Sequence, residues 1–194
     1  MTRIHPHWLT AAPTQKVIAA LSTVDPLFVG GCVRDALMGR EAHDIDIAVP
    51  VEPQHVMALL EKAGLRALPI GMEHGVVAAL VDDQTIEVAT LRRDVETDGR
   101  RAVVAFTDDI AEDAQRRDFT VNALYARPDG KVLDPNGRGV ADLTAKRLRF
   151  IGDASTRIIE DYLRILRFYR FSAQFGRSDF DAEAQVACHA LAEG

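Results

Sequence analysis

The sequence predicts an α+β fold, with a small mixed sheet flanked by helices and then the start of an all-helical region. Between residues 27 and 150, short β-rich runs alternate with helical segments and hairpin patterns, an order typical of a mixed sheet. From Ser155 onward, apolar residues recur at helical spacing. We therefore expect an N-terminal extension with one helix (1–26), a sheet domain (27–150) and the beginning of a helical domain (151–194).

The first elements are predicted from their flanking residues. Residues 14–23 start with Thr14, a residue type that caps helices, and carry apolar residues at helical spacing, so we expect a short helix there. The run "PLFVGG" predicts a buried strand ended by glycines, and residues 32–38 predict a short helix. Residues 45–49, "IDIAV", predict a second strand.

A helix and a hairpin are expected next. Pro53 stands where a helix favours proline, and Gly64 stands just past its end. Two β-rich runs within 76–91 surround Asp82 and Asp83, which predicts a hairpin.

The rest of the sheet domain is less regular. Residues 92–118 are charged and weakly periodic, and we expect a long mobile loop and a short helix, since long loops in ordered domains are often functional. A strand pair follows around Asp129 and Gly130, then a short helix near 138–145 and a strand near 147–151.

In the helical region, Ile158, Tyr162, Ile165 and Tyr169 form one stripe, so both tyrosines are expected in the core. Asp153 or Ser155 is expected to cap the first helix.

Composition excludes several classes of protein. A chain of 194 residues that is 47% hydrophobic can bury a substantial core. It has no run of ~20 apolar residues, as a membrane helix needs, and its first residues lack the pattern of a signal peptide. Cys32 and Cys188 lack metal-ligand spacing, so we expect free thiols, a cytoplasmic chain and no membrane partner.

The charge is uneven along the chain. The net charge is −6, yet residues 138–177 hold nine Lys and Arg against four Asp and Glu. This basic stretch could face phosphates while the acidic part binds cations, or it could be a solvated helix face. Charge alone leaves both interpretations open.

Asp44 and Asp46 are the first candidate site residues. In a strand over 45–49 they project to one side, ~7 Å apart, while Ile45 and Ile47 enter the core. Like charges so placed repel unless a cation lies between them, and oxygen-only ligands favour Mg²⁺ over zinc. A solvent-facing acidic strand end is the alternative for the motif taken alone.

The glycines upstream strengthen the Mg²⁺ interpretation. A strand that runs into Gly30 and Gly31 and then a helix leaves backbone N–H groups free to bind a phosphate, and Arg34 can add a charged donor. Two glycines before a helix are common in turns, but a phosphate cradle close to a carboxylate pair is a more specific pattern. Together they indicate a nucleoside triphosphate with metal ions at the reacting phosphorus.

Glu87, on the second strand of the expected hairpin, is a third candidate carboxylate. It could accept the proton of an attacking hydroxyl or share a metal ion. Periodicity alone equally permits an exposed strand glutamate.

Five segments, in order, resemble one known family, and they span about residues 27–176. They are "LFVGGCVRDALMGREAHDIDIAV", "IEVATLRRD", "RRDFTVNALY", "LDPNGRGVADL" and "EDYLRILRFYRFSAQFG". The family is the class II CCA-adding tRNA nucleotidyltransferases, with the related bacterial poly(A) polymerases. "GMEHGVVAALVDD" is more similar to the CCA-adding group.

The resemblance implies a fold and a reaction. The fold is a five-stranded nucleotidyltransferase palm, similar to that of DNA polymerase beta, followed by a helical neck. The reaction is attack of the 3′-hydroxyl of a tRNA on the α-phosphate of CTP or ATP, without a nucleic-acid template. Residues 92–106 match a mobile loop of the family.

The resemblance also implies roles for particular residues. Asp44 and Asp46 would bind two Mg²⁺ ions, and Glu87 would be the third carboxylate. The residues implied to bind the nucleotide in the palm are Gly30, Gly31, Arg34, Arg116, Arg117, Asp118 and Asn122. In the neck, Asp161 and Arg164 are expected on one helix with their ends meeting, as a pattern that matches a base edge, with Arg167 and Arg170 following at three-residue steps.

Other functions stay open beside CCA addition. The enzyme could be a poly(A) polymerase or add only CC or only A, and the chain could be a non-catalytic nucleotide-binding module. An ion pair on a helix surface is the ordinary alternative for Asp161 and Arg164. Family members are usually about twice this long, so the expected binding of a tRNA 3′ end depends on regions beyond these residues.

Overall fold

The computed structural model describes residues 2–42, 44–98, 101–175 and 180–193. The strands in these ranges are Leu27–Val29 (β1), Asp46–Val49 (β2), Arg66–Gly71 (β3), Val76–Val81 (β4), Gln84–Thr90 (β5), Arg92–Asp98 (β6), Arg101–Phe106 (β7), Tyr125–Ala126 (β8) and Val132–Leu133 (β9). The α-helices are His7–Thr10 (α1), Ala12–Ala20 (α2), Gly31–Leu37 (α3), Pro53–Lys62 (α4), Ile110–Gln115 (α5), Gly139–Thr144 (α6), Ala154–Glu160 (α7), Leu163–Gln174 (α8) and Ala182–Ala190 (α9). Single 3₁₀ turns lie at Ser22–Val24 (η1), Met72–His74 (η2) and Thr120–Asn122 (η3).

The main sheet is mixed, as predicted. Its strand order is β3-β4-β5-β2-β1-β8-β9, with β2 and β5 parallel and the other neighbours antiparallel. The sheet has seven strands where the family resemblance implies five, because the two-residue strands β8 and β9 extend it past β1. The parallel pair at its centre sets β2 directly beside β5.

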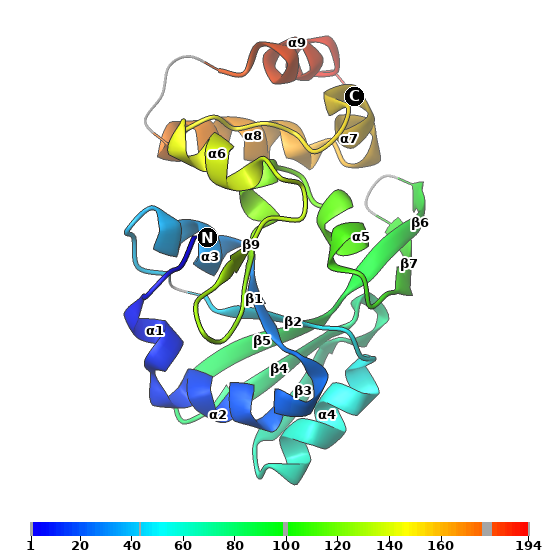
Figure 1. Ribbon diagram of the computed structural model, residues 1–194. Helices are drawn as coiled ribbons and strands as arrows, with labels where there is room; N and C mark the ends of the chain where they lie inside the picture. The colour runs from blue at the N-terminus through cyan, green and yellow to red at the C-terminus, as the bar shows by residue number, and fades with distance from the viewer. Residues whose placement is uncertain (1, 43, 99–100, 176–179, 194) are drawn as a thin grey trace.

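Helices α2 and α4 cover one face of this sheet, and α6 to α9 lie beyond its other side (Figure 1). The core between α2, α4 and the sheet is mainly apolar. It contains Val17, Leu21, Val56, Leu60, Val77, Ile86 and Val88, all at most 1% exposed. None of the described helices is both long and apolar enough to cross a membrane.

The N-terminal segment packs on the sheet domain. Ile4 donates its backbone N–H to Gly130, and Val132 donates to Thr2, so the segment lies along the edge at β9. Ile4 is 3% exposed, and the Trp8 ring meets Phe28 edge-on at 4.9 Å. This part of the chain therefore contributes to the core of the sheet domain.

The start of the first long helix differs from the prediction. Helix α2 begins at Ala12 rather than Thr14, and no side chain caps its N-terminus. Pro13 lies in its first turn, where the fixed φ of proline favours a helix start. Thr14 is instead buried inside the helix.

Several predicted elements are confirmed. The segments from β1 to α4 form as expected, and Gly64 follows α4 with a φ of +77°. The hairpin of β4 and β5 turns at Asp82, whose φ of +53° is a left-handed conformation that aspartate tolerates in turns.

The prediction of a long loop over 92–118 is wrong. Its first part forms the hairpin of β6 and β7, a separate two-stranded sheet, and the predicted short helix is α5. β6 and β7 satisfy their backbone hydrogen bonds by pairing with each other, and the charged side chains do not prevent this pairing. Residues 99 and 100, within the predicted mobile loop, lie outside the described ranges.

The predicted strand near 147–151 does not form. This segment makes only an isolated bridge between Phe119 and Phe150. The Phe150 ring packs against Phe119 at 4.7 Å and stacks on Phe168 at 5.8 Å. The segment therefore joins the sheet domain to the helices through its aromatic side chain.

The helical region is interrupted where one long helix was expected. Asp153 caps α7 by accepting hydrogen bonds from the backbone N–H and hydroxyl of Thr156, as predicted. The chain then leaves the helix at Asp161, whose φ of −158° and ψ of 104° are extended, before α8 begins. Phe168 and Phe171 of α8 complete an aromatic cluster with Phe119.

Candidate active site

Two carboxylates lie side by side at the centre of the sheet, and a third lies near them. Asp46 is the first residue of β2, and Asp44 precedes it in the exposed approach to the strand. The parallel register of β2 and β5 places Asp46 beside Glu87. Ile47 is fully buried and Ile45 packs against the core, as predicted, so apolar neighbours hold the carboxylates in place.

The charged form of the Asp46 carboxylate is disfavoured by its surroundings. Its pKa is raised to about 6, first by burial and then by the neighbouring carboxylates of Glu87 and Asp44, against an opposing effect of Arg117. Repulsion among carboxylates favours binding of a cation between them.

The donor set fits Mg²⁺. All three groups offer oxygen ligands, and Mg²⁺ in proteins usually binds one or two carboxylates and completes its shell with water and substrate phosphates. Within the described ranges, no group of three or more His, Cys, Asp and Glu side chains is arranged to hold a metal ion.

Gly30 forms a sharp turn beside Arg117, the arginine that acts on the Asp46 carboxylate. Its φ of 73° and ψ of −123° are open to glycine alone, and it leads from β1 into α3. A Cβ at Gly30 would lie 3.6 Å from Nη1 of Arg117 and 3.7 Å from the carbonyl oxygen of Asn122. A Cβ at Gly31 would lie 3.9 Å from Nη2 of Arg34. Because the two glycines have no side chain, the backbone at this turn is uncovered next to the guanidinium groups of Arg117 and Arg34.

Arg34 is buried and fully oriented. It donates Nε and Nη2 to the carboxylate of Asp35 at 2.9 and 3.0 Å, and Nη1 to Oδ1 of Asn122 at 2.7 Å. Asn122 in turn donates to Oδ1 of Asp118 at 3.1 Å. Arg34 and Asn122, both predicted site residues, therefore belong to one hydrogen-bonded chain.

The chain of contacts continues into the helical region through Asp118. Arg167 of α8 donates Nε and Nη2 to Oδ2 of Asp118, at 2.7 and 2.6 Å. The guanidinium groups of Arg34, Arg167 and Arg170 all lie over the ring of Phe171, at 5.0, 5.4 and 5.1 Å from its centroid. Arg167 and Arg170 thus lie near the sheet-domain residues of the site.

Arg116 and Arg117 are held by a residue that the sequence analysis did not single out. Asp113 of α5, 1% exposed, accepts from Arg116 on Oδ1 and from Arg117 on Oδ2. The hydroxyl of Tyr125 donates to the same Oδ2 at 2.5 Å. The spacing of three and four residues from Asp113 to the arginines was a signal available in the sequence.

The expected pairing of Asp161 with Arg164 is wrong. Asp161 lies between two helices, and its Oδ1 accepts from the backbone N–H of Leu163 at 3.0 Å. Arg164 donates Nη1 to Glu160 at 2.7 Å and to the carbonyl of Arg157 at 2.9 Å. The break in the helix separates the two side chains that an unbroken helix would bring together.

The expected burial of Tyr162 and Tyr169 is also wrong. They are 37% and 39% exposed, because the break at Asp161 changes the direction of the residues after it relative to those of α7, so the predicted apolar stripe is not continuous. Ile158 alone of that stripe is fully buried, and Ile165 is partly buried against the core.

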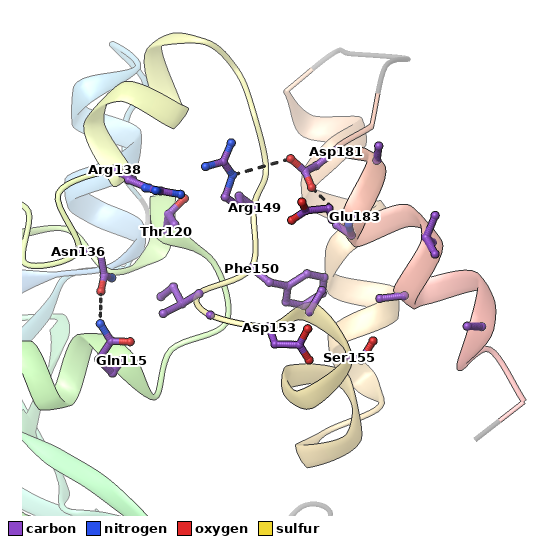
Figure 2. Close-up of a pocket in the computed structure, with 18 residues that line it drawn as sticks. Gln115, Thr120, Asn136, Arg138, Arg149, Phe150, Asp153, Ser155, Asp181 and Glu183 are labelled. Atoms are coloured by element: carbon purple, nitrogen blue, oxygen red, sulfur yellow. Dashed lines mark hydrogen bonds and ion pairs between the residues drawn. The ribbon is translucent and has the colours of Figure 1, made fainter.

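A large cavity lies away from Asp44, Asp46 and Glu87. It has a volume of about 940 Å³ and is lined by α9, the segment before α7 and the ends of α5 and α6. In Figure 2, Arg149 reaches toward Asp181, 3.8 Å away, and Gln115 donates to Asn136 at 2.9 Å. None of the predicted site residues lines it, so we do not assign the site to this cavity.

Comparison with known proteins gives a family. A sequence profile described as "Poly A polymerase head domain" matches residues 27–149. A CCA tRNA nucleotidyltransferase 1, mitochondrial, from Danio rerio is 45% identical over 143 residues, which are 73% of this chain and 33% of that protein. The chain spans 33% to 38% of the length of the first curated relatives that it matches.

Solved structures agree with the sequence matches. The Bacillus stearothermophilus CCA-adding enzyme in complex with CTP superposes with a TM-score of 0.79 and 32% identity, over 92% of this chain and 43% of that one. A tRNA nucleotidyltransferase complexed with a primer tRNA and an incoming ATP analog superposes with a TM-score of 0.73 and 27% identity, over 92% and 49%.

Proposed function

Because the chain belongs to the Poly A polymerase head domain family, we propose that it transfers CMP and AMP from CTP and ATP to the 3′ end of tRNA, without a nucleic-acid template. The printed names of its relatives support CCA addition, and two similar structures hold CTP and an ATP analog with a primer tRNA. We assign residues 1–26 to an extension, 27–150 to the head domain and 151–194 to the start of a helical neck.

One observation carries the proposal. The register of β2 and β5 sets Asp46 beside Glu87, with Asp44 close enough to affect the same titration and Arg117 opposing it. Arg117 also borders the bare turn at Gly30. Arg117 thus lies near both the carboxylates that would bind a cation and the glycine turn that would bind phosphates.

Asp44 and Asp46 would hold Mg²⁺. When bound there, Mg²⁺ supplies activation of the attacking hydroxyl and neutralisation of the leaving phosphates. Glu87, exposed on β5, is placed to accept the hydroxyl proton or to share the ion.

In the proposed reaction, the 3′-hydroxyl oxygen of the RNA forms a bond to the α-phosphorus of the nucleotide. The bond from that phosphorus to the oxygen bridging to the β-phosphate breaks, and pyrophosphate leaves with the electron pair. The hydroxyl proton passes to a carboxylate of the site or to water.

The nucleotide would lie across the turn at Gly30 and Gly31. We assign Arg117 and Arg34 to the phosphates, and Arg116, Asp118 and Asn122 to the ribose and phosphates, with Asn122 also holding Arg34. The hydrogen bond from Arg34 to Asn122 and the ion pair of Arg117 with Asp113 support this assignment, because both fix a guanidinium near the turn.

The neck residues would read the base. Asp161 and Arg164 remain our candidates for the base edge, although they are not paired with each other, since each is held by other groups and keeps a fixed direction. Arg167 and Arg170, against Phe171, would support the same region. We also propose a cytoplasmic setting, which the two free, buried cysteines favour.

The test supplies a full-length form of the protein with a tRNA that lacks its terminal CCA, Mg²⁺, and CTP and ATP separately and together. We expect two additions with CTP alone and three with both nucleotides. Long A-runs on unrelated RNA would favour a poly(A) polymerase, the second candidate, which the description of the matching family supports. Nucleotide binding without incorporation would favour a non-catalytic module.

A further inference from the structure

Asp113 makes an unusual number of contacts for one carboxylate. Its Oδ1 accepts from Nε and Nη2 of Arg116 at 2.9 and 2.6 Å, and from the backbone N–H of Arg92 at 3.2 Å. Its Oδ2 accepts from Nε and Nη2 of Arg117 at 3.1 and 2.9 Å, and from Tyr125 at 2.5 Å. A side chain that is 1% exposed and accepts all of these bonds is held in one orientation.

The charges explain why an acid is needed at this position. Two adjacent guanidinium groups repel, and burial adds the cost of removing them from water. The single carboxylate offsets one positive charge and leaves the other. The cluster of Asp113, Arg116 and Arg117 therefore keeps a net positive charge that can meet an anion.

The geometry aims one edge of Arg117 at the glycine turn. Its Nε and Nη2 are used by Asp113, whereas Nη1 lies beside Gly30 and makes no hydrogen bond to any described part of the chain. The Arg117 guanidinium also lies 5.5 Å from the centroid of the Tyr125 ring. Asp113 holds one edge of the guanidinium and the Tyr125 ring lies against one face, so Nη1 is available to a ligand at the turn.

The same carboxylate also anchors the hairpin that follows β5. The backbone N–H of Arg92, first residue of β6, donates to Asp113, and Nε of Arg116 donates back to the carbonyl of Arg92 at 3.0 Å. β5 carries Glu87. Asp113 therefore links Arg117, beside the glycine turn, to the start of the strand that follows β5.

We infer that Asp113 is a positioning residue for the nucleotide: it acts through Arg117, whose Nη1 it directs to the phosphates at the Gly30 turn. This inference rests on the proposed function. Asp113 touches neither the phosphates nor the reacting atoms; it sets the direction of a guanidinium that does.

The first test measures Arg117 itself, by the ¹⁵Nε–¹H resonance of its side chain in the unliganded 194-residue chain. We expect a slowly exchanging Arg117 resonance in the wild type, and its loss in Asp113→Asn. Asp109→Asn is the matched control, because Asp109 caps the same helix through the backbone N–H of Ala111 and touches neither arginine. An unchanged Arg117 resonance in Asp113→Asn would overturn the inference.

The second test is a double-mutant cycle on the dissociation constant for CTP, with Asp113→Asn and Arg117→Met alone and combined. Asp113→Asn is expected to raise Kd by about tenfold in the wild-type background, the worth of a hydrogen-bonded charge. In the Arg117→Met background it should raise Kd by no more than about twofold. Tenfold losses in both backgrounds would show that Asp113 does not act through Arg117.

Asp113→Glu covers the case in which the asparagine variant fails to fold. It keeps the charge and moves the carboxylate by one methylene, so it should fold and still raise the Kd for CTP by about threefold or more. An unchanged Kd would contradict the inference. A wild-type chain that binds no CTP would refute the proposed function, and the Arg117 resonance would still show whether Asp113 orients that side chain.

Discussion

Arg167 on α8 and Asp118 in the segment after α5 form an ion pair of 2.6 Å, although they are 49 positions apart in the chain. Asp118 also accepts from its neighbour Phe119 and from Asn122. One carboxylate thus joins the helical region to the residues around the glycine turn.

Removal of this link should loosen the helical region. Asp118 is 7% exposed, and Arg167→Ala would leave its Oδ2 without that partner. Because Arg167 is 41% exposed, water replaces part of the lost contact, and we expect a loss of about 1 kcal/mol in the free energy of unfolding, measured in urea. Lys16→Ala, which breaks a surface pair with Asp82, should change little. Equal effects would contradict a role for Asp118 at the junction.

Gly30→Ala should impair both stability and nucleotide binding. The conformation of Gly30 is one that alanine strains to adopt, at a cost of about 1–3 kcal/mol. Gly39→Ala is the control, since Gly39 also has a positive φ, +68°, and no atom within 4 Å of its added Cβ. We expect both variants to lose stability in thermal unfolding, and only Gly30→Ala to weaken CTP binding in calorimetry. If both variants weakened CTP binding equally, the turn at Gly30 would not be part of the nucleotide site.

Acid should weaken the protein through Asp113. Burial favours the neutral acid, but Arg117 and Arg116 outweigh it and lower the pKa of Asp113 from 3.8 to about 2. Because the folded-state pKa is depressed, this stabilisation is complete above the unfolded pKa and is lost as pH falls toward 2. We expect the wild type to lose about 2 kcal/mol more than Asp113→Asn between pH 5 and pH 2, in urea titrations at each pH. Parallel pH profiles would contradict this.

The N-terminal helix should be required for the stability of the sheet domain. Leu21, at the end of α2, is fully buried in the main core, and Leu21→Ala should cost about 2–5 kcal/mol. Val186→Ala on α9, where the side chain is 70% exposed, should cost far less. Thermal or urea unfolding checks both, and a small effect at Leu21 would mean that residues 1–26 are only loosely attached.

Local signals made much of the fold predictable. The glycines after β1, Pro53 and the Asp82 turn each fix the backbone within a few residues, so the elements around them could be located from sequence. Alternation along β2 also made the contrast between Asp46 and the buried Ile47 predictable, whereas Asp44 lies before the strand.

The errors arose where contacts between residues far apart in the sequence determine the structure. The parallel pairing of β2 with β5 and the hairpin of β6 with β7 depend on strand partners that periodicity does not specify. The break at Asp161 removed the expected contact with Arg164 and exposed two tyrosines. The spacing of Asp113 to Arg116 and Arg117 was visible in the sequence, but its contacts with Tyr125 and Arg92, which fix the orientation of its carboxylate, arise only in the folded chain.

The central claim, that Asp44 and Asp46 form a metal-dependent nucleotidyl-transfer site, is tested most directly by incorporation of labelled CMP from CTP into tRNA lacking its CCA end, with and without Mg²⁺. In a full-length form of the protein, we expect Mg²⁺-dependent incorporation by the wild type and by the surface control Asp83→Asn, and none by the Asp44→Ala/Asp46→Ala double variant with its fold intact. Incorporation by the folded double variant at the wild-type rate would contradict the account.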